Sequence, residues 1–129
     1  MSEKILVIDD EETTVNLISM LLERKGFEVI KAYGAEEGLR KAYRHQPDLV
    51  LLDIMMPEMD GWEVCKRLRD MSDVPIIFLT ALTRDEDLER GIEAGGDDYL
   101  FKPLSEVVLA AKVRAMQLID EVEDMRRGL

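Results

Sequence analysis

The sequence predicts an α/β domain in which a parallel sheet is covered by helices on both faces. Short apolar runs alternate five times with longer segments whose apolar residues recur at helical spacing. One of these runs, Leu49–Leu52, is apolar throughout, as expected for a strand that is buried on both faces. Such alternation implies parallel strands that are joined by right-handed helical crossovers.

The 129 residues are enough for one domain with its own core. Hydrophobic residues make up 47% of the chain and charged residues 35%, and no apolar run is long enough to span a membrane. The first residues, Met1–Lys4, lack the charged and apolar regions of a signal peptide. We therefore expect a cytoplasmic protein that makes no contact with a membrane.

The formal net charge of -11 argues against nucleic-acid binding by this segment, because such binding requires a basic face. Any contact with DNA would have to come from another domain. The single cysteine, Cys65, has apolar neighbours and is expected to be a small core residue.

Five strands are expected, at Lys4–Ile8, Phe27–Ala32, Asp48–Asp53, Pro75–Thr80 and Tyr99–Lys102. With five helices between and after them, they predict a flavodoxin-like (βα)5 doubly wound sheet with the strand order 2-1-3-4-5.

Two of the helices carry N-terminal capping signals. Asp60 with Glu63 predicts the start of the third helix, and Thr83 with Glu86 is a capping-box signature for the fourth. Trp62, next to the first of these signals, is expected to be a partly exposed packing residue.

The last helix is expected to begin at Pro103–Ser105 and to extend beyond the domain. We expect residues 1–119 to form the domain and residues 120–129 to form a helical extension, which would begin a linker to an output domain. Apolar residues with the spacing of a coiled-coil seam are Ala115, Leu118, Val122, Met125 and Leu129. The alternative is a long terminal helix whose end frays, since two heptads are too few for a definite seam.

Polar residues stand where four of the strands end: Asp9, Asp10, Asp53, Thr80 and Lys102. Neighbouring parallel strands would bring them to one edge of the sheet. Each close pair of carboxylates there costs on the order of 4 kcal/mol at about 4 Å and an effective dielectric near 20. Lys102 alone cannot neutralise three acids, so the pattern favours a cation with hard oxygen ligands, such as Mg²⁺.

A carboxylate beside Mg²⁺ can attack phosphorus and form an acyl phosphate. Lys102 can pair with one phosphoryl oxygen and the hydroxyl of Thr80 can donate a hydrogen bond to another. The single histidine, His45, lies at a helix end far from this edge, so acyl transfer by a catalytic triad is unsupported.

Four segments carry a resemblance to a known family: Val7–Asp10, Leu51–Gly61, Leu79–Ala81 and Gly95–Pro103. In order and spacing they resemble the receiver domain of two-component response regulators, over about Lys4 to Met116. The resemblance implies that Asp53 accepts a phosphoryl group from a phosphohistidine of a sensor histidine kinase or histidine phosphotransfer protein.

The same resemblance implies the rest of the site. Mg²⁺ would be held by Asp9, Asp10, Asp53 and the backbone carbonyl of Met55. Thr80 and Lys102 would bind the phosphoryl group, and the Lys102–Pro103 peptide would be cis, although sequence alone favours trans.

The resemblance further implies a switch. Thr80 would move toward the phosphoryl group and Tyr99 would turn inward, changing the surface of the fourth helix, fifth strand and fifth helix. Homodimers or an output domain would use that surface or the C-terminal helix. From the residues alone, Tyr99 is equally well a half-buried strand aromatic with a solvated hydroxyl.

Three alternatives stay open. A Mg²⁺-dependent phosphatase with an aspartyl nucleophile would carry a second acid where Met55 stands. A flavin or nucleotide carrier would need a phosphate-binding loop after the first strand, where Asp9–Glu12 would repel phosphate. A degenerate receiver would act by protein contacts alone. We expect a signalling domain and not an enzyme, with at most self-phosphorylation from small donors and a slow self-dephosphorylation because Met55 and Leu82 are apolar.

Overall fold

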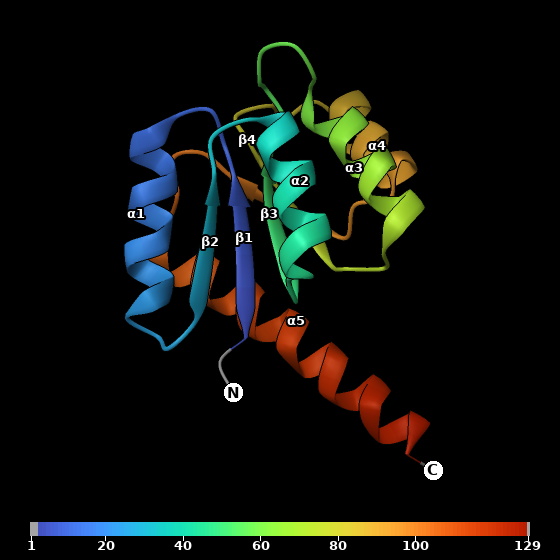
Figure 1. The fold of residues 1–129 in the computed structure, drawn as a ribbon. Coiled ribbons are helices and arrows are strands. Elements are labelled where there is room, and N and C mark those ends of the chain that lie inside the picture. The colour runs from blue at the N-terminus through green and yellow to red at the C-terminus, as the bar shows by residue number, and fades with distance from the viewer. Residues whose placement is uncertain (1–2, 129) are drawn as a thin grey trace.

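The computed structural model describes residues 3–128, in which five strands alternate with five helices (Figure 1). The elements are β1 Lys4–Ile8, α1 Glu12–Glu23, β2 Glu28–Ala32, α2 Ala35–His45, β3 Leu49–Asp53, α3 Gly61–Met71, β4 Ile76–Thr80, α4 Asp85–Ala94, β5 Asp98–Phe101 and α5 Glu106–Arg127. The strands pair in parallel in the order β2-β1-β3-β4-β5. The predicted fold and strand order are therefore confirmed.

The sheet separates two apolar cores. Leu6 and Ile8 of β1 pack on the side of α2, α3 and α4, whereas Ile5 and Val7 pack on the side of α1 and α5. All four are fully buried. Since burying a Leu, Ile or Val side chain stabilises by roughly 1.5–3 kcal/mol and a surface ion pair by about 0–1 kcal/mol, the two cores hold the sheet in place.

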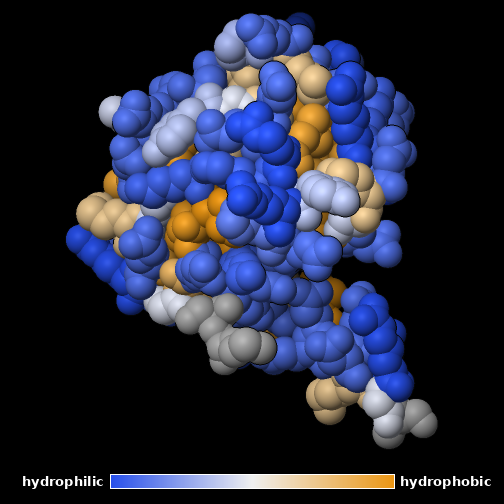
Figure 2. Space-filling model, in the orientation of Figure 1, coloured by the Kyte–Doolittle hydropathy of each residue, from blue (hydrophilic) through white to orange (hydrophobic). Residues whose placement is uncertain are grey.

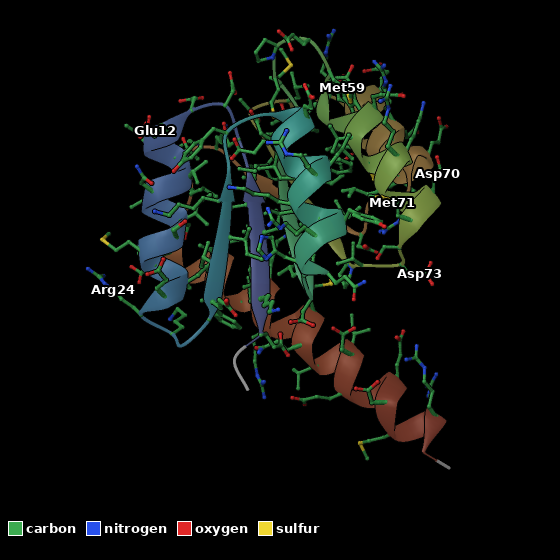
Figure 3. The ribbon with its side chains drawn as sticks, in the orientation of Figure 1. Glu12, Arg24, Met59, Asp70, Met71 and Asp73 are labelled. Atoms are coloured by element: carbon green, nitrogen blue, oxygen red, sulfur yellow. The ribbon has the colours of Figure 1, made fainter. Side chains whose placement is uncertain are left out.

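The charges of α1 complement its dipole. Glu12 lies in its first turn and Arg24 follows its last residue, at opposite ends of the helix (Figure 3). An acid near the amino end and a cation near the carboxyl end both interact favourably with the helix dipole. These two charges stabilise α1, which begins just after the acidic residues that follow β1.

Only one of the two predicted capping signals is used. The carboxylate of Asp60 accepts a hydrogen bond from the Glu63 amide at 2.9 Å, so that prediction is confirmed. The capping box at Thr83 is wrong, because the chain stays extended through Arg84 and α4 begins at Asp85 with no side-chain cap. The Arg84 carbonyl closes the first turn instead, since it accepts from the amides of Asp87 and Leu88.

Trp62 also differs from its predicted exposure. Its side chain is only 6% exposed and belongs to the core on the side of α2, α3 and α4. The guanidinium of Arg90, on α4, lies 4.0 Å from the centre of the Trp62 ring and covers it. Trp62 therefore packs between α3 and α4, where a cation–π contact adds to its burial.

Helix α5 is longer than the sheet requires and projects beyond it (Figure 1). Its buried residues are Leu109 and Val113, both in the first half of the helix. The predicted seam residues Ala115, Leu118, Val122 and Met125 are exposed, and Leu129 lies outside the described residues. On the face seen in Figure 2 the projecting part is mostly hydrophilic. Among residues 3–128, no helix combines the length and the apolar character needed to span a membrane.

We expect Asp60→Ala to lower the free energy of unfolding by about 1 kcal/mol, because the cap on the Glu63 amide is lost. Thr83→Ala is the matched control and should change it by less than about 0.5 kcal/mol, since Thr83 caps nothing. Urea unfolding of the two variants measures both values. A loss in Thr83→Ala equal to that in Asp60→Ala would contradict the observed start of α4.

Candidate functional site

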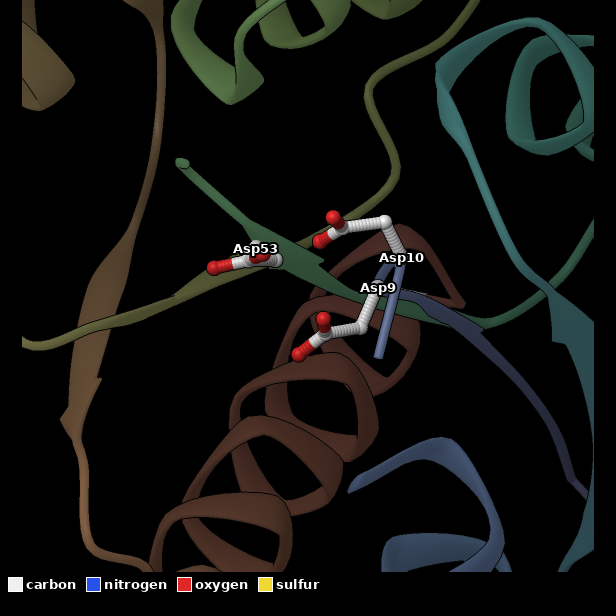
Figure 4. A group of neighbouring side chains, drawn as sticks. All are labelled: Asp9, Asp10 and Asp53. Atoms are coloured by element: carbon white, nitrogen blue, oxygen red, sulfur yellow. The ribbon is translucent and has the colours of Figure 1, made fainter. Parts of the chain in front are cut away.

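Three carboxylates meet at the carboxyl edge of the sheet. Asp9 and Asp10 directly follow β1, and Asp53 is the last residue of β3. The parallel register pairs Ile8 with Leu52, so the next residues of both strands emerge side by side. One carboxylate oxygen from each of the three residues lies within 4.8 Å of the others. Figure 4 shows the three side chains side by side. The strand ends thus assemble the acidic cluster.

Lys102 reaches this cluster from the end of β5. Its ammonium nitrogen lies 3.0 Å from a carboxylate oxygen of Asp9 and 3.4 Å from one of Asp53. Both acids are buried, Asp9 being 0% and Asp53 2% exposed, whereas Asp10 is exposed. One cation therefore lies between two buried carboxyl groups.

This arrangement shifts the pKa values of its members. Burial raises the pKa of Asp53, the Asp9 carboxylate raises it further, and Lys102 opposes both, with the result that it rises from 3.8 to about 7. For Lys102, burial lowers the pKa, but the hydrogen bond with Asp9 and the charge of Asp53 outweigh burial and raise it. The lysine stays charged, and the negative charge of the pair of buried acids is only partly neutralised.

The donor set fits a divalent cation. Carboxylate oxygens are hard ligands of the kind that Mg²⁺ prefers, and Asp10 leaves one side of the cluster open to water. A bound cation would also remove the repulsion that raises the pKa of Asp53. Asp9, Asp10 and Asp53 could therefore hold a metal ion.

The other predicted residues stand around the same edge. Thr80 ends β4, next to β3, and its buried hydroxyl oxygen accepts a hydrogen bond from the Leu82 amide at 2.9 Å. Met55 follows Asp53 by two residues and its side chain is 61% exposed. The Lys102–Pro103 peptide bond is cis.

Tyr99 points toward α4. Its hydroxyl donates a hydrogen bond to the Leu88 carbonyl at 2.7 Å, with the Asp87 carbonyl at 3.2 Å. Its ring centre lies 5.4 Å from that of Phe78 and 6.1 Å from that of Phe101. The hydroxyl is thus bonded to the backbone of α4, which differs from the solvated hydroxyl that one interpretation of the sequence implied.

Two residues at the site were not predicted. Glu11 places a carboxylate oxygen 3.6 Å from the Lys102 nitrogen, and its amide donates to Asp9 at 2.9 Å. Gly61 lies so close to β3 that a Cβ there would overlap the Asp53 carbonyl oxygen and stand 2.7 Å from Ile54 Cα. A glycine directly after the helix cap Asp60 was a signal for this close approach, but the acidic run at Glu11 gave none.

The fold and this edge define a receiver domain. The family model described as the response regulator receiver domain matches residues 5–114, and the chain belongs to this family. It is 46% identical over 123 residues to the alkaline phosphatase synthesis transcriptional regulatory protein PhoP of Bacillus subtilis (strain 168), an alignment that covers 95% of this chain and 51% of that protein. The chain spans about half the length of the curated relatives it matches.

Solved structures agree with this assignment. A two-component response regulator from Clostridium difficile is 36% identical with a TM-score of 0.88, covering 90% of this chain and 96% of that one. A CheY-like receiver domain protein from Methanospirillum hungatei JF-1 is 29% identical with a TM-score of 0.88, covering 97% and 99%. The resemblance seen in the sequence is confirmed, and as a receiver domain the segment is a phospho-acceptor signalling module of two-component signal transduction rather than a catalytic enzyme.

The raised pKa of Asp53 predicts a pH-dependent stability when metal is removed with EDTA. Between pH 3.8 and about 7 the folded protein holds a proton on Asp53 that the unfolded chain has released, so folding weakens as the pH rises through this range. Asp53→Asn cannot titrate. The free energy of unfolding of Asp53→Asn minus that of the parent should therefore increase from pH 4.5 to 7, by at most about 1.4 kcal/mol per pH unit. Above pH 7 the difference should stay constant.

Urea unfolding at a series of pH values measures this difference. Asp70→Asn, which changes an exposed acid on α3, is the control and should differ from the parent equally at every pH. A difference for Asp53→Asn that stays constant with pH would contradict the burial and repulsion described for Asp53.

Proposed function

We propose that Asp53 accepts a phosphoryl group from a phosphohistidine of a sensor histidine kinase or histidine phosphotransfer protein, and that this phosphorylation switches the surface formed by α4, β5 and α5. The observation that carries the proposal is the buried carboxylate of Asp53, which lies 3.4 Å from Lys102 and within the acidic cluster.

The transfer needs positioning and charge neutralisation more than acid–base catalysis. A carboxylate oxygen of Asp53 forms a bond to phosphorus while the bond from phosphorus to the donor's imidazole nitrogen breaks. The imidazole leaves with the bonding electrons and takes up a proton. Asp53 suits the acceptor role because it is the buried acid that ends the central strand β3, at the edge that a partner can reach.

In this proposal Asp9, Asp10, Asp53 and the backbone carbonyl of Met55 hold Mg²⁺. When bound, the cation would neutralise the carboxylates and the phosphoryl oxygens. Lys102 would then exchange part of its contact with Asp9 and Asp53 for a phosphoryl oxygen, which its position between the two acids allows.

Thr80 and Tyr99 would transmit the phosphorylation of Asp53 to the surface formed by α4, β5 and α5. As Thr80 moves toward the phosphoryl group to donate its hydroxyl, the hydrogen bond that it now accepts from the Leu82 amide would lengthen or break. That amide belongs to the loop before α4, so this loop would shift with Thr80, and Tyr99, whose ring already lies against α4, would turn further inward into the space that Thr80 leaves.

The surface affected is rich in exposed apolar side chains. On α4, β5 and α5 they include Ile92 at 67%, Phe101 at 44%, Val107 at 78% and Val108 at 43%. Such a patch suits a protein partner, and we propose either a second copy of the receiver or an output domain as that partner, here or along the projecting part of α5.

The curated relatives are named as transcriptional regulators, of which this chain spans about half. We propose a similar role for a protein that contains this segment, working in the cytoplasm. The net charge of -11 supports the proposal that any DNA binding comes from another domain.

Incubation with acetyl phosphate and Mg²⁺ should add one phosphoryl group, detected as an adduct in the intact-protein mass. The adduct should be absent without Mg²⁺ and absent in Asp53→Asn, because the acceptor oxygen is lost. Asp70→Asn should be phosphorylated like the parent, since this exposed acid lies on α3, outside the acidic cluster.

Other outcomes distinguish the alternatives. A folded protein that binds Mg²⁺ by calorimetry but forms no adduct would be a degenerate receiver that acts by protein contacts alone. Repeated turnover of a phosphate ester would instead support the aspartyl phosphatase.

The adduct should also decay slowly. Met55 and Leu82 flank the acceptor edge with apolar side chains that give an attacking water no hydrogen-bonding partner. Met55→Asn or Leu82→Glu should speed the loss of the phosphoryl group about tenfold, which corresponds to ~1.4 kcal/mol of activation free energy. Met71→Asn, a change of an exposed methionine at the far end of α3, is the control and should have no effect. A fast decay that neither substitution alters would contradict this role.

A further inference from the structure

Helix α4 contains a glycine in the middle of its run, at Gly91. Glycine stabilises a helix interior less than alanine does, so a glycine there needs another reason. The reason is not a left-handed backbone, since Gly91 is an ordinary helical residue. It is buried, and the space beside it is occupied.

That space holds the side chain of Tyr99. A Cβ on Gly91 would overlap the Tyr99 hydroxyl oxygen and stand 2.8 Å from its Cζ and 2.9 Å from Phe78 Cε2. The hydroxyl lies there because it donates to the Leu88 carbonyl, one turn earlier in α4. The end of the Tyr99 ring therefore occupies the position that an alanine methyl would fill.

We propose that Gly91 is a positioning residue for Tyr99. Its missing side chain leaves a seat between α4 and β4, formed by Gly91 and Leu88 of α4 and Phe78 of β4, that lets Tyr99 take its inward position before Asp53 is phosphorylated. The regulatory part of this inference rests on the proposed function, in which Tyr99 belongs to the switch.

The strand register connects this seat to the acceptor site. Tyr99 of β5 is paired with Phe78 of β4, and two residues further along the same strands Phe101 is paired with Thr80. Lys102 follows directly. A displacement of the Tyr99 ring would thus act on the two strands that present Thr80 and Lys102 to the phosphoryl group.

The seat can be tested by a cycle of variants. In the parent protein Gly91→Ala should lower the urea midpoint, because the methyl group and the tyrosine ring compete for one space. In a Tyr99→Ala background the same change should lower the midpoint far less or raise it, because only the contact with Phe78 remains and that ring can move into the space that Tyr99 leaves. The single variant Gly91→Ala can fold poorly. In that case the comparison of the double variant Gly91→Ala/Tyr99→Ala with Tyr99→Ala still tests the proposal.

Gly34→Ala is the matched control, because a Cβ on Gly34 would contact nothing within 4 Å. Its effect should be the same with and without Tyr99. If Gly91→Ala raises the midpoint of the parent, or lowers it equally in both backgrounds, then Gly91 does not provide a seat for Tyr99.

A second measurement follows the ring itself. Tyr33 and Tyr43 are exposed, so the NMR signals of ¹³C-labelled tyrosine should set the half-buried Tyr99 apart from them. In Gly91→Ala the Tyr99 ring signals should move toward those of Tyr43. Unchanged Tyr99 signals in the folded variant would overturn the proposal.

The link to regulation is tested on the same samples with acetyl phosphate and Mg²⁺. Both the parent and Gly91→Ala should gain the Asp53 adduct, but only in the parent should hydrogen exchange of the α4 amides change on phosphorylation. An equal change in both would overturn the regulatory role of the seat. If neither protein gains an adduct, the proposed function fails, whereas the unfolding and NMR results still decide whether the seat exists.

Discussion

Asp9 and Asp53 are held 0% and 2% exposed beside a single lysine, and folding must supply the energy that keeps these like charges together. The two apolar cores supply it, because β1 and β3 are fixed in register between them and cannot spread apart. The buried acids lower the free energy of unfolding at the edge where the protein acts, as is common at functional sites. A bound cation would restore part of this free energy, because the ion binds the folded arrangement and not the unfolded chain.

Much of this could be predicted from the sequence, because it follows from regularities of the parallel sheet. Apolar runs such as Leu49–Leu52 are typical of strands buried on both faces, and the alternation with helices restricts the topology. The residue after such a strand must emerge at its carboxyl edge. Asp9, Asp53 and Lys102 are separated by up to 93 residues in the chain, yet this rule alone brings them to one place.

The features that the sequence did not predict depend on residues that are distant in the chain and close in the fold. Thr83 satisfies the capping-box pattern, but the loop after β4 stays extended for one residue more and Arg84 takes the cap position. Trp62 is buried because Arg90, on the next helix, covers its ring. The hydroxyl of Tyr99 finds the Leu88 carbonyl only because Gly91 leaves room. Each depends on the path of a loop or on a contact between two elements, and both are decided only when the elements pack.

The length of α5 turns small movements into large ones. Its 22 residues correspond to about 33 Å of helix, yet its buried anchors, Leu109 and Val113, are confined to the first half. The first half of the helix is thus held against the sheet, and the second half projects beyond it (Figure 1). A tilt of about 5° at the anchored end would carry the far end of a ~33 Å helix through about 3 Å. A slight rearrangement at the carboxyl edge of the sheet would thus appear at the far end of α5 as a displacement of about 3 Å.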